Sequence, residues 1–98
     1  MAYVSTELRL MVPSMNASSP QLWSLQGVDA AAAVNTADFI TDALARGMRK
    51  GDVVLYTQWD NISTKATVSG HTLLTVLTVD ADGADLSDGT AISATNTD

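Results

Sequence analysis

The stretch LWSLQGVDAAAAVNTADFITDALARGMRKGDVVLYTQW, residues 22–59, holds four of the five aromatic side chains of the chain together with many of its aliphatic ones. It begins with a short apolar segment, 22–25, that we expect to form a strand with Trp23 facing inward. Asp29 can cap a short alanine helix that extends through Ala33. Alanine adds almost no side-chain volume, so this helix can pack closely against another surface.

The second half of this stretch changes from a helical to a strand pattern. From 37 to 46 the apolar spacing is helical, with Phe39 four residues before Ala43. Gly47 is then a natural C-cap for that helix. The residues after it, 52–59, are rich in β-branched and aromatic side chains, which predicts a buried strand.

The N-terminal residues show the alternation of a strand. Leu8, Leu10 and Val12 are expected on one face. Pro13 and the polar residues after it predict a link without regular structure. We therefore expect an extended arm that adds to the sheet edge of a neighbouring chain.

The C-terminal half predicts a hairpin. A polar strand is expected over 63–68, Ser69 and Gly70 form a two-residue loop, and an apolar strand follows over 71–79. Its apolar residues fall on two faces, with Leu73, Leu77 and Val79 on one and Leu74 and Val76 on the other. A strand that is apolar on both faces lies between two layers or meets another subunit.

These elements predict one α+β domain that is mostly β. We expect a small antiparallel sheet, sandwich or barrel-like domain with one or two short helices and an extended N-terminal arm. Residues 1–19 are assigned to the arm and link, 20–94 to the compact domain and 95–98 to a loose tail. The chain has 98 residues and no cysteine, so association with other chains is the remaining way to strengthen a thin core.

Composition excludes two kinds of partner. Five basic residues against eleven acidic ones argue against nucleic-acid binding, because phosphate neutralisation needs clustered Lys and Arg. No apolar run reaches the length of a membrane span. The first residues carry Glu7 and Arg9 where a signal peptide is apolar, so we expect a soluble protein that is not exported.

No residue pattern predicts catalysis, a metal site or a cofactor, so we do not expect an enzyme. His71 has no adjacent carboxylate or cysteine to form a catalytic or metal-binding group. The aspartates of 80–89 lack the spacing of an EF-hand and are explained by two Asp-Gly turns, although a looser calcium site stays open. Trp23 and Trp59 are expected in the core, with stacking on a sugar as the alternative.

The order of residues from 20 to 54 resembles a small module of tailed-bacteriophage virion proteins, found in head-decoration (cement) and fibre-type proteins. The matching features are the LWSL segment, Asp29 before the alanines, the helical segment with Phe39, and Gly51-Asp52 before a hydrophobic strand. Leu25 departs from the pattern, because a tyrosine usually stands there. These motifs are structural and carry over no catalytic residues.

The resemblance implies a capsid decoration protein that bridges major capsid subunits on the outer surface of the virion, made in the host cytoplasm and forming a homotrimer. The residues expected to contact the capsid or a neighbour are Leu8, Leu10, Val12, Arg46, Arg49 and Lys50. The alternatives are the base or shaft of a head or tail fibre, or a carbohydrate- or receptor-binding virion module that uses Trp23 or Trp59. A small hydrolase is the third interpretation.

Overall fold

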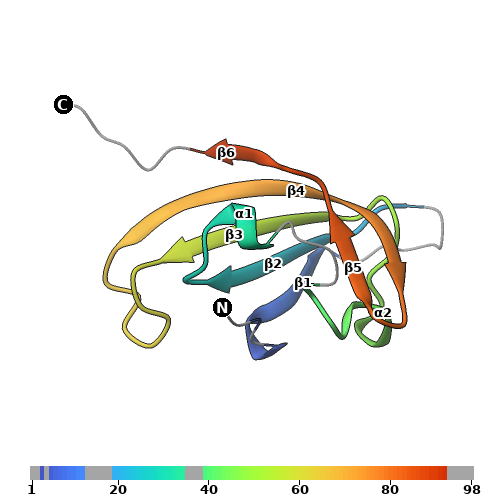
Figure 1. The fold of residues 1–98 in the computed structure, drawn as a ribbon, viewed down its shortest axis with the longest axis horizontal. Coiled ribbons are helices and arrows are strands. Elements are labelled where there is room, and N and C mark those ends of the chain that lie inside the picture. The colour runs from blue at the N-terminus through green and yellow to red at the C-terminus, as the bar shows by residue number, and fades with distance from the viewer. Residues whose placement is uncertain (1–2, 4, 13–18, 35–38, 93–98) are drawn as a thin grey trace.

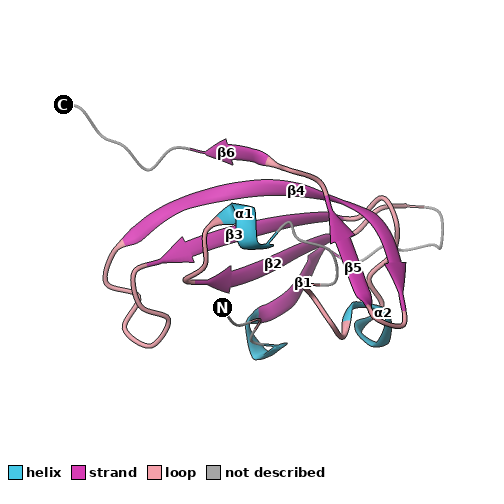
Figure 2. Cartoon of the chain, in the orientation of Figure 1, coloured by secondary structure: helices cyan, strands magenta, loops and turns pink. Residues whose placement is uncertain are grey.

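A computed structural model of the chain describes residues 3, 5–12, 19–34 and 39–92, and strands dominate them (Figures 1 and 2). The expected class, α+β and mostly β, is confirmed. In chain order the elements are the 3-10 helix η1 (Ser5–Glu7), β1 (Leu8–Val12), β2 (Leu22–Gly27), α1 (Ala31–Val34), α2 (Ala43–Arg46), β3 (Val53–Trp59), β4 (Val68–Asp80), β5 (Gly83–Leu86) and β6 (Thr90–Ile92).

The strands form one curled, mixed sheet with the shape of a half-barrel. The order is β1-β2-β3-β4-β5, and β6 pairs with β4. The expected antiparallel pairing holds except at one place, where β2 and β3 run parallel. Two parallel neighbours need a long crossover connection. Here the crossover carries both α-helices, α1 and α2, which is why the helical pattern lies between these two strands.

Strand β4 is longer than expected and contains the residues assigned to a hairpin loop. It runs through Ser69 and Gly70 without turning, and Gly70 pairs with Gln58 of β3. The chain turns earlier, between 60 and 67. Asp60 Oδ1 accepts the Thr67 N–H at 3.1 Å. Asn61 Oδ1 accepts the N–H groups of Ser63 and Thr64. The predicted strand over 63–68 and the Ser69-Gly70 loop are therefore wrong, because side-chain oxygens already satisfy the backbone of the earlier turn.

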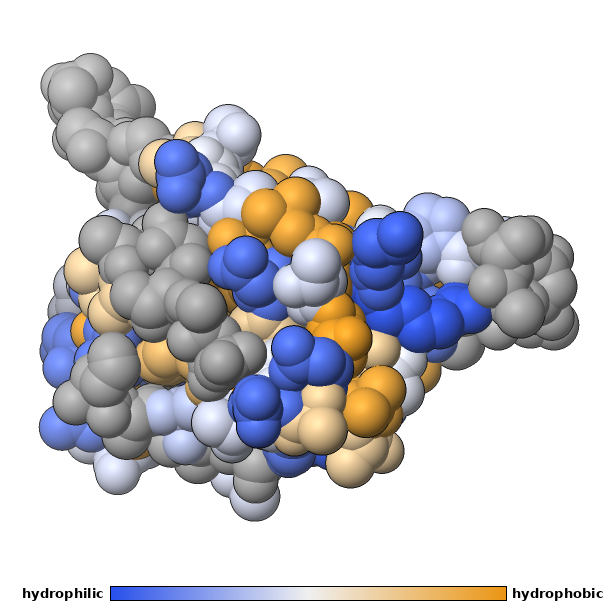
Figure 3. Space-filling view, turned by 45° about the vertical axis from the view of Figure 1, so that its right-hand side comes forward, coloured by the Kyte–Doolittle hydropathy of each residue, from blue (hydrophilic) through white to orange (hydrophobic). Residues whose placement is uncertain are grey.

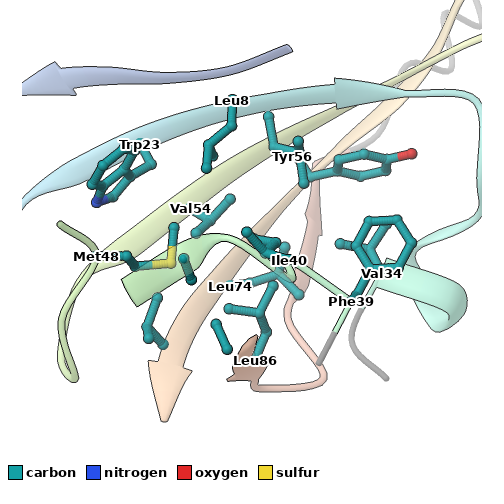
Figure 4. Close-up of a cluster of buried hydrophobic side chains, with 14 residues drawn as sticks. Leu8, Trp23, Val34, Phe39, Ile40, Met48, Val54, Tyr56, Leu74 and Leu86 are labelled. Atoms are coloured by element: carbon teal, nitrogen blue, oxygen red, sulfur yellow. The ribbon is translucent and has the colours of Figure 1, made fainter. Parts of the chain in front are cut away.

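The core lies on one face of the sheet, and the crossover covers it (Figure 4). Trp23 and Leu25 of β2 lie in register with Val54 and Tyr56 of β3, so all four side chains point to the same side. Among its described residues, the crossover adds five buried hydrophobic side chains to this face: Val34, Phe39, Ile40, Ala43 and Met48. The segment that was singled out for its apolar content therefore supplies most of the core.

The helix expected over 37–46 is much shorter. Residues 37 and 38 lie outside those that the structure describes, and α2 has only four residues. Ile40 instead forms an isolated β-bridge with Ala84, whose N–H donates to the Ile40 carbonyl at 3.2 Å. Gly47 is confirmed as the C-cap, with φ 92° and the paired backbone hydrogen bonds of a Schellman motif.

The N-terminal strand belongs to the sheet rather than to a free arm. β1 pairs antiparallel with β2, and Leu8 is completely buried in the core. The Tyr3 hydroxyl donates to Asp42 Oδ1 at 2.5 Å, and Arg46 donates to the Leu8 carbonyl. The expected arm is thus wrong for 5–12, whereas the link over 13–18 and the tail over 95–98 lie outside the described residues.

Candidate interaction surface

The three apolar residues expected to contact a neighbour do not share a face. Leu8 is buried, so its assignment as a contact residue is wrong. Leu10 pairs with the inward-facing Trp23 and lies at the open edge of the core face, where 43% of it is exposed. A bulge between Leu10 and Val12 changes the alternation, so Val12 lies on the opposite face and is 52% exposed. Only Leu10 and Val12 remain available to a partner.

The face of the sheet opposite the core carries an apolar cluster that we call the outer patch. Val12 lies opposite Leu22, Leu22 opposite Val53, and in the next row Leu55 lies opposite Leu73. Residues directly opposite each other in neighbouring strands point to the same side. The outer patch consists of Val12, Leu22, Val53, Leu55, Leu73 and Leu77, all of them exposed or half-buried.

No ionisable residue lies within the outer patch as defined by the strand register. Arg9 borders it on β1, and His71 borders it on β4, where its Nδ1 is 3.0 Å from Thr57 Oγ1. Figure 3 shows exposed hydrophobic residues between hydrophilic ones on the side of the molecule that it draws, where α2 and β5 come forward. Contiguous exposed apolar patches on small proteins typically mark interaction sites.

Strand β4 has the two predicted apolar faces, except that Val79 lies on the core face and not on the outer face with Leu73 and Leu77. Leu73 and Leu77 are exposed on the outer face, and Leu74 and Val76 are buried, as expected. A bulge between Val76 and Thr78 then turns Val79 toward the core, where it lies opposite Ala84. The simple two-residue period could not place Val79, because a bulge inserts one extra residue.

The basic residues expected to meet an acidic partner have different environments. Arg46 forms an ion pair with Asp42 at 3.3 Å, and Arg49 donates to the Ser19 carbonyl at 2.9 Å. Both arginines therefore hold the chain's own segments together. Lys50 is exposed beside them, so the positive charge offered to a partner at this end centres on Lys50.

The two tryptophans do not form a joint sugar-binding platform. Trp23 is buried, and its Nε1 donates to Asp52 Oδ2 at 2.9 Å. Trp59 donates to Gln26 Oε1 at 2.8 Å, and Gln26 alternates with the inward-facing Leu25. The tryptophans thus lie on opposite faces of the sheet, and Trp23 is excluded as a stacking residue.

Asp52 is a buried carboxylate whose role the sequence interpretation missed. It accepts hydrogen bonds from the backbone N–H groups of Gln21 and Arg49, from Gln21 Nε2 and from Trp23 Nε1. Burial alone would raise the pKa of Asp52, but these four hydrogen bonds outweigh it and hold the pKa below its ordinary value. The available signal was the Gly51-Asp52 pair directly before a buried strand.

Of the aspartates of 80–89, Asp80 serves the turn between β4 and β5. Asp80 Oδ1 accepts the N–H groups of Asp82 and Gly83, at 2.9 and 3.2 Å. Among residues 3, 5–12, 19–34 and 39–92, no three acidic or histidine side chains gather closely enough to hold a metal ion. In the same residues no helix is long and apolar enough to span a membrane.

No protein-family model, curated protein or solved structure matches the chain. Its function must therefore be inferred from its own residues and their geometry.

Proposed function

We propose that this chain is a structural protein of a tailed-bacteriophage virion, a decoration protein that stabilises the head by bridging major capsid subunits on its outer surface. The outer patch is the observation that carries this proposal. It offers aliphatic side chains from four neighbouring strands on a rigid sheet, and their burial against a partner stabilises a complex without any reactive group.

The sequence resemblance over 20–54 supports the virion as the place where this surface is used. A small chain with a core on one side of a curled sheet also gains stability when a second surface covers the other side. We propose a homotrimer as the assembled state, made in the host cytoplasm before it binds the shell. A base or shaft of a head or tail fibre is the alternative within the same class.

The copy number in purified virions tests the proposal against the fibre alternative. We expect a copy number of the same order as that of the major capsid protein, measured by quantitative gel densitometry. A few copies in each virion would contradict decoration and favour a fibre component.

A single charge placed in the outer patch tests whether this surface binds the shell. Leu73→Asp should abolish binding to undecorated capsids in a cosedimentation experiment, while the circular dichroism spectrum stays unchanged. Val28→Asp is the matched control, because Val28 is 47% exposed, close to the 40% of Leu73, and does not belong to the patch. Equal binding by both variants would contradict the proposal.

A further inference from the structure

The chain contains two Asp-Gly pairs, Asp82-Gly83 and Asp88-Gly89, and the structure gives them different surroundings. An Asp-Gly pair can rearrange without an enzyme, because glycine has no Cβ atom to hinder attack by its own backbone nitrogen. The nitrogen bonds to the side-chain carboxyl carbon of the aspartate, and one water leaves as a succinimide ring closes. Addition of one water then reopens the ring to aspartate or to isoaspartate. In isoaspartate the main chain runs through the former side chain and is one carbon atom longer.

The Asp82-Gly83 pair is protected by the sheet. The Gly83 N–H donates to Asp80 Oδ1 at 3.2 Å, and Gly83 is a buried residue at the start of β5. There it lies opposite Asp80 of β4. The Gly83 nitrogen must therefore leave a hydrogen bond and a strand pairing before it can attack the Asp82 carboxyl group.

The Asp88-Gly89 pair is open. Both residues are exposed and lie between β5 and β6, outside either strand. Within the described ranges 3, 5–12, 19–34 and 39–92, neither the Asp88 carboxylate nor the Gly89 N–H takes part in a hydrogen bond. The attacking nitrogen and the carboxyl group are therefore free to react with each other, and water reaches both.

The two residues 88–89 also set the place of β6 along β4. Before them, the Ser87 N–H donates to the Thr75 carbonyl at 2.8 Å, and Ser87 Oγ accepts the Thr75 N–H at 2.9 Å. After them, Thr90 pairs with Leu73. Because only two residues join these fixed points, a longer main chain between them cannot keep both.

We propose that Asp88 is a site of spontaneous isoaspartate formation and that this modification releases β6 from β4. The extra main-chain carbon cannot be taken up toward β4, since even a Cβ atom at Gly89 would lie 2.6 Å from Thr72 Cγ2. Thr90 lies opposite Leu73 of the outer patch, so the release of β6 changes the border of that patch. The consequence for capsid binding rests on the proposed function, but the modification does not.

Incubation of the native chain at neutral pH and physiological temperature tests the proposal. We expect isoaspartate to form at Asp88 at least about tenfold faster than at Asp82, because the Asp82 pair reacts only in molecules in which the start of β5 has opened. In urea the two pairs should react at similar rates. A methyltransferase specific for isoaspartate measures its amount, and electron-transfer mass spectrometry of proteolytic peptides locates it.

Asp88→Glu is the matched variant, because it keeps the charge and its longer side chain disfavours the five-membered ring. In the native chain, amide hydrogen exchange of Thr90–Ile92 should become faster as isoaspartate accumulates. In Asp88→Glu it should stay unchanged over the same incubation. Asp82→Glu should behave like the native chain in both measurements.

Equal amounts of isoaspartate at Asp82 and Asp88 in the native chain would overturn the proposal. Slower reaction of Asp82 in urea would do the same, because the folded structure would then not be what separates the two pairs. Modification at Asp88 with unchanged exchange of Thr90–Ile92 would overturn the release of β6. Capsid binding is measured separately. If the native chain fails to bind capsids but is modified at Asp88 as expected, the virion role is wrong and the Asp88 assignment stands.

Discussion

Asp52 joins two segments of the chain, 21–23 and 49–52, through the two oxygens of one carboxylate. Its pKa is lower in the folded protein than its ordinary value of 3.8, because the hydrogen bonds from Gln21, Trp23 and Arg49 favour the charged form. A group with a depressed folded-state pKa stabilises the fold fully above its unfolded-state pKa. This contribution is lost as the pH falls below that value and through the folded-state pKa.

Asp52→Asn tests this contribution. The amide keeps the shape of the side chain but replaces one acceptor oxygen with a donor, so buried N–H groups lose their partner. We expect a loss of about 1–3 kcal/mol in the free energy of unfolding at pH 7, measured by urea denaturation. The difference from the native protein should shrink below about pH 4, where the Asp52 carboxylate of the unfolded chain begins to take up a proton while that of the folded chain is still charged. A difference that does not depend on pH would contradict the assignment.

The packing of Gly27 against Tyr56 depends on one atom, the Tyr56 hydroxyl oxygen. The Tyr56 hydroxyl donates to the Asp29 carbonyl at 2.5 Å, and burial raises the pKa of Tyr56 to about 12. A Cβ atom at Gly27 would lie 3.0 Å from that hydroxyl oxygen and 3.4 Å or more from the ring carbons. The hydroxyl oxygen alone is therefore closer than an ordinary van der Waals contact, so a side chain at Gly27 would have to displace it by a few tenths of an ångström.

A double-mutant cycle tests this packing. Gly27→Ala should destabilise the native protein by about 1–2 kcal/mol through overpacking. In the Tyr56→Phe background the same change should cost at least about 0.5 kcal/mol less, because the close oxygen is gone. Chemical denaturation of the four proteins gives the coupling energy, and additive effects would show that the hydroxyl is not the obstacle.

At the scale of elements, β6 depends on a glycine for its place along β4. Gly89 has φ +85°, and a Cβ there would lie 2.6 Å from Thr72 Cγ2 and 3.1 Å from the Leu73 carbonyl oxygen. Gly51 has a similar φ of +94° but open space around it. The two glycines thus share a backbone requirement and differ in packing.

Gly89→Ala should therefore destabilise the protein by about 1–3 kcal/mol more than Gly51→Ala. Both substitutions place an alanine in the left-handed backbone region, which is unfavourable for a residue with a Cβ atom. Only the first also brings that Cβ atom into steric overlap with β4. Amide hydrogen exchange should show faster exchange in Thr90–Ile92 for the first variant alone. Equal destabilisation by the two variants would mean that β6 does not need the close approach at Gly89.

At the scale of the whole molecule, the N-terminal segment helps to hold the domain together. Leu8→Ala should cost about 2–4 kcal/mol, because it leaves a cavity in a fully packed core. Val12→Ala should change the free energy of unfolding by less than about 0.5 kcal/mol, since Val12 is largely exposed. Urea denaturation followed by tryptophan fluorescence measures both. Similar small effects would support an N-terminal arm that does not contribute to the core.

The fold class, the inward Trp23 and the Gly47 cap followed from local pattern, because burial and backbone preference act over a few residues. The parallel β2–β3 pair and the bridge of Ile40 with Ala84 depend on contacts between distant segments, which periodicity does not contain. The bulges at Leu10 and after Val76 were missed for the same reason. The outer patch was foreseen only through the two faces of β4.

The outer patch exists only when four strands have the correct alignment. A shift of β4 by one residue would turn Leu74 and Val76 outward and bring Leu73 and Leu77 to the core side. A misaligned molecule would therefore present a different surface to its partner. In the proposed role, attachment to the shell would therefore select the copies of the protein whose sheet has formed with the correct register.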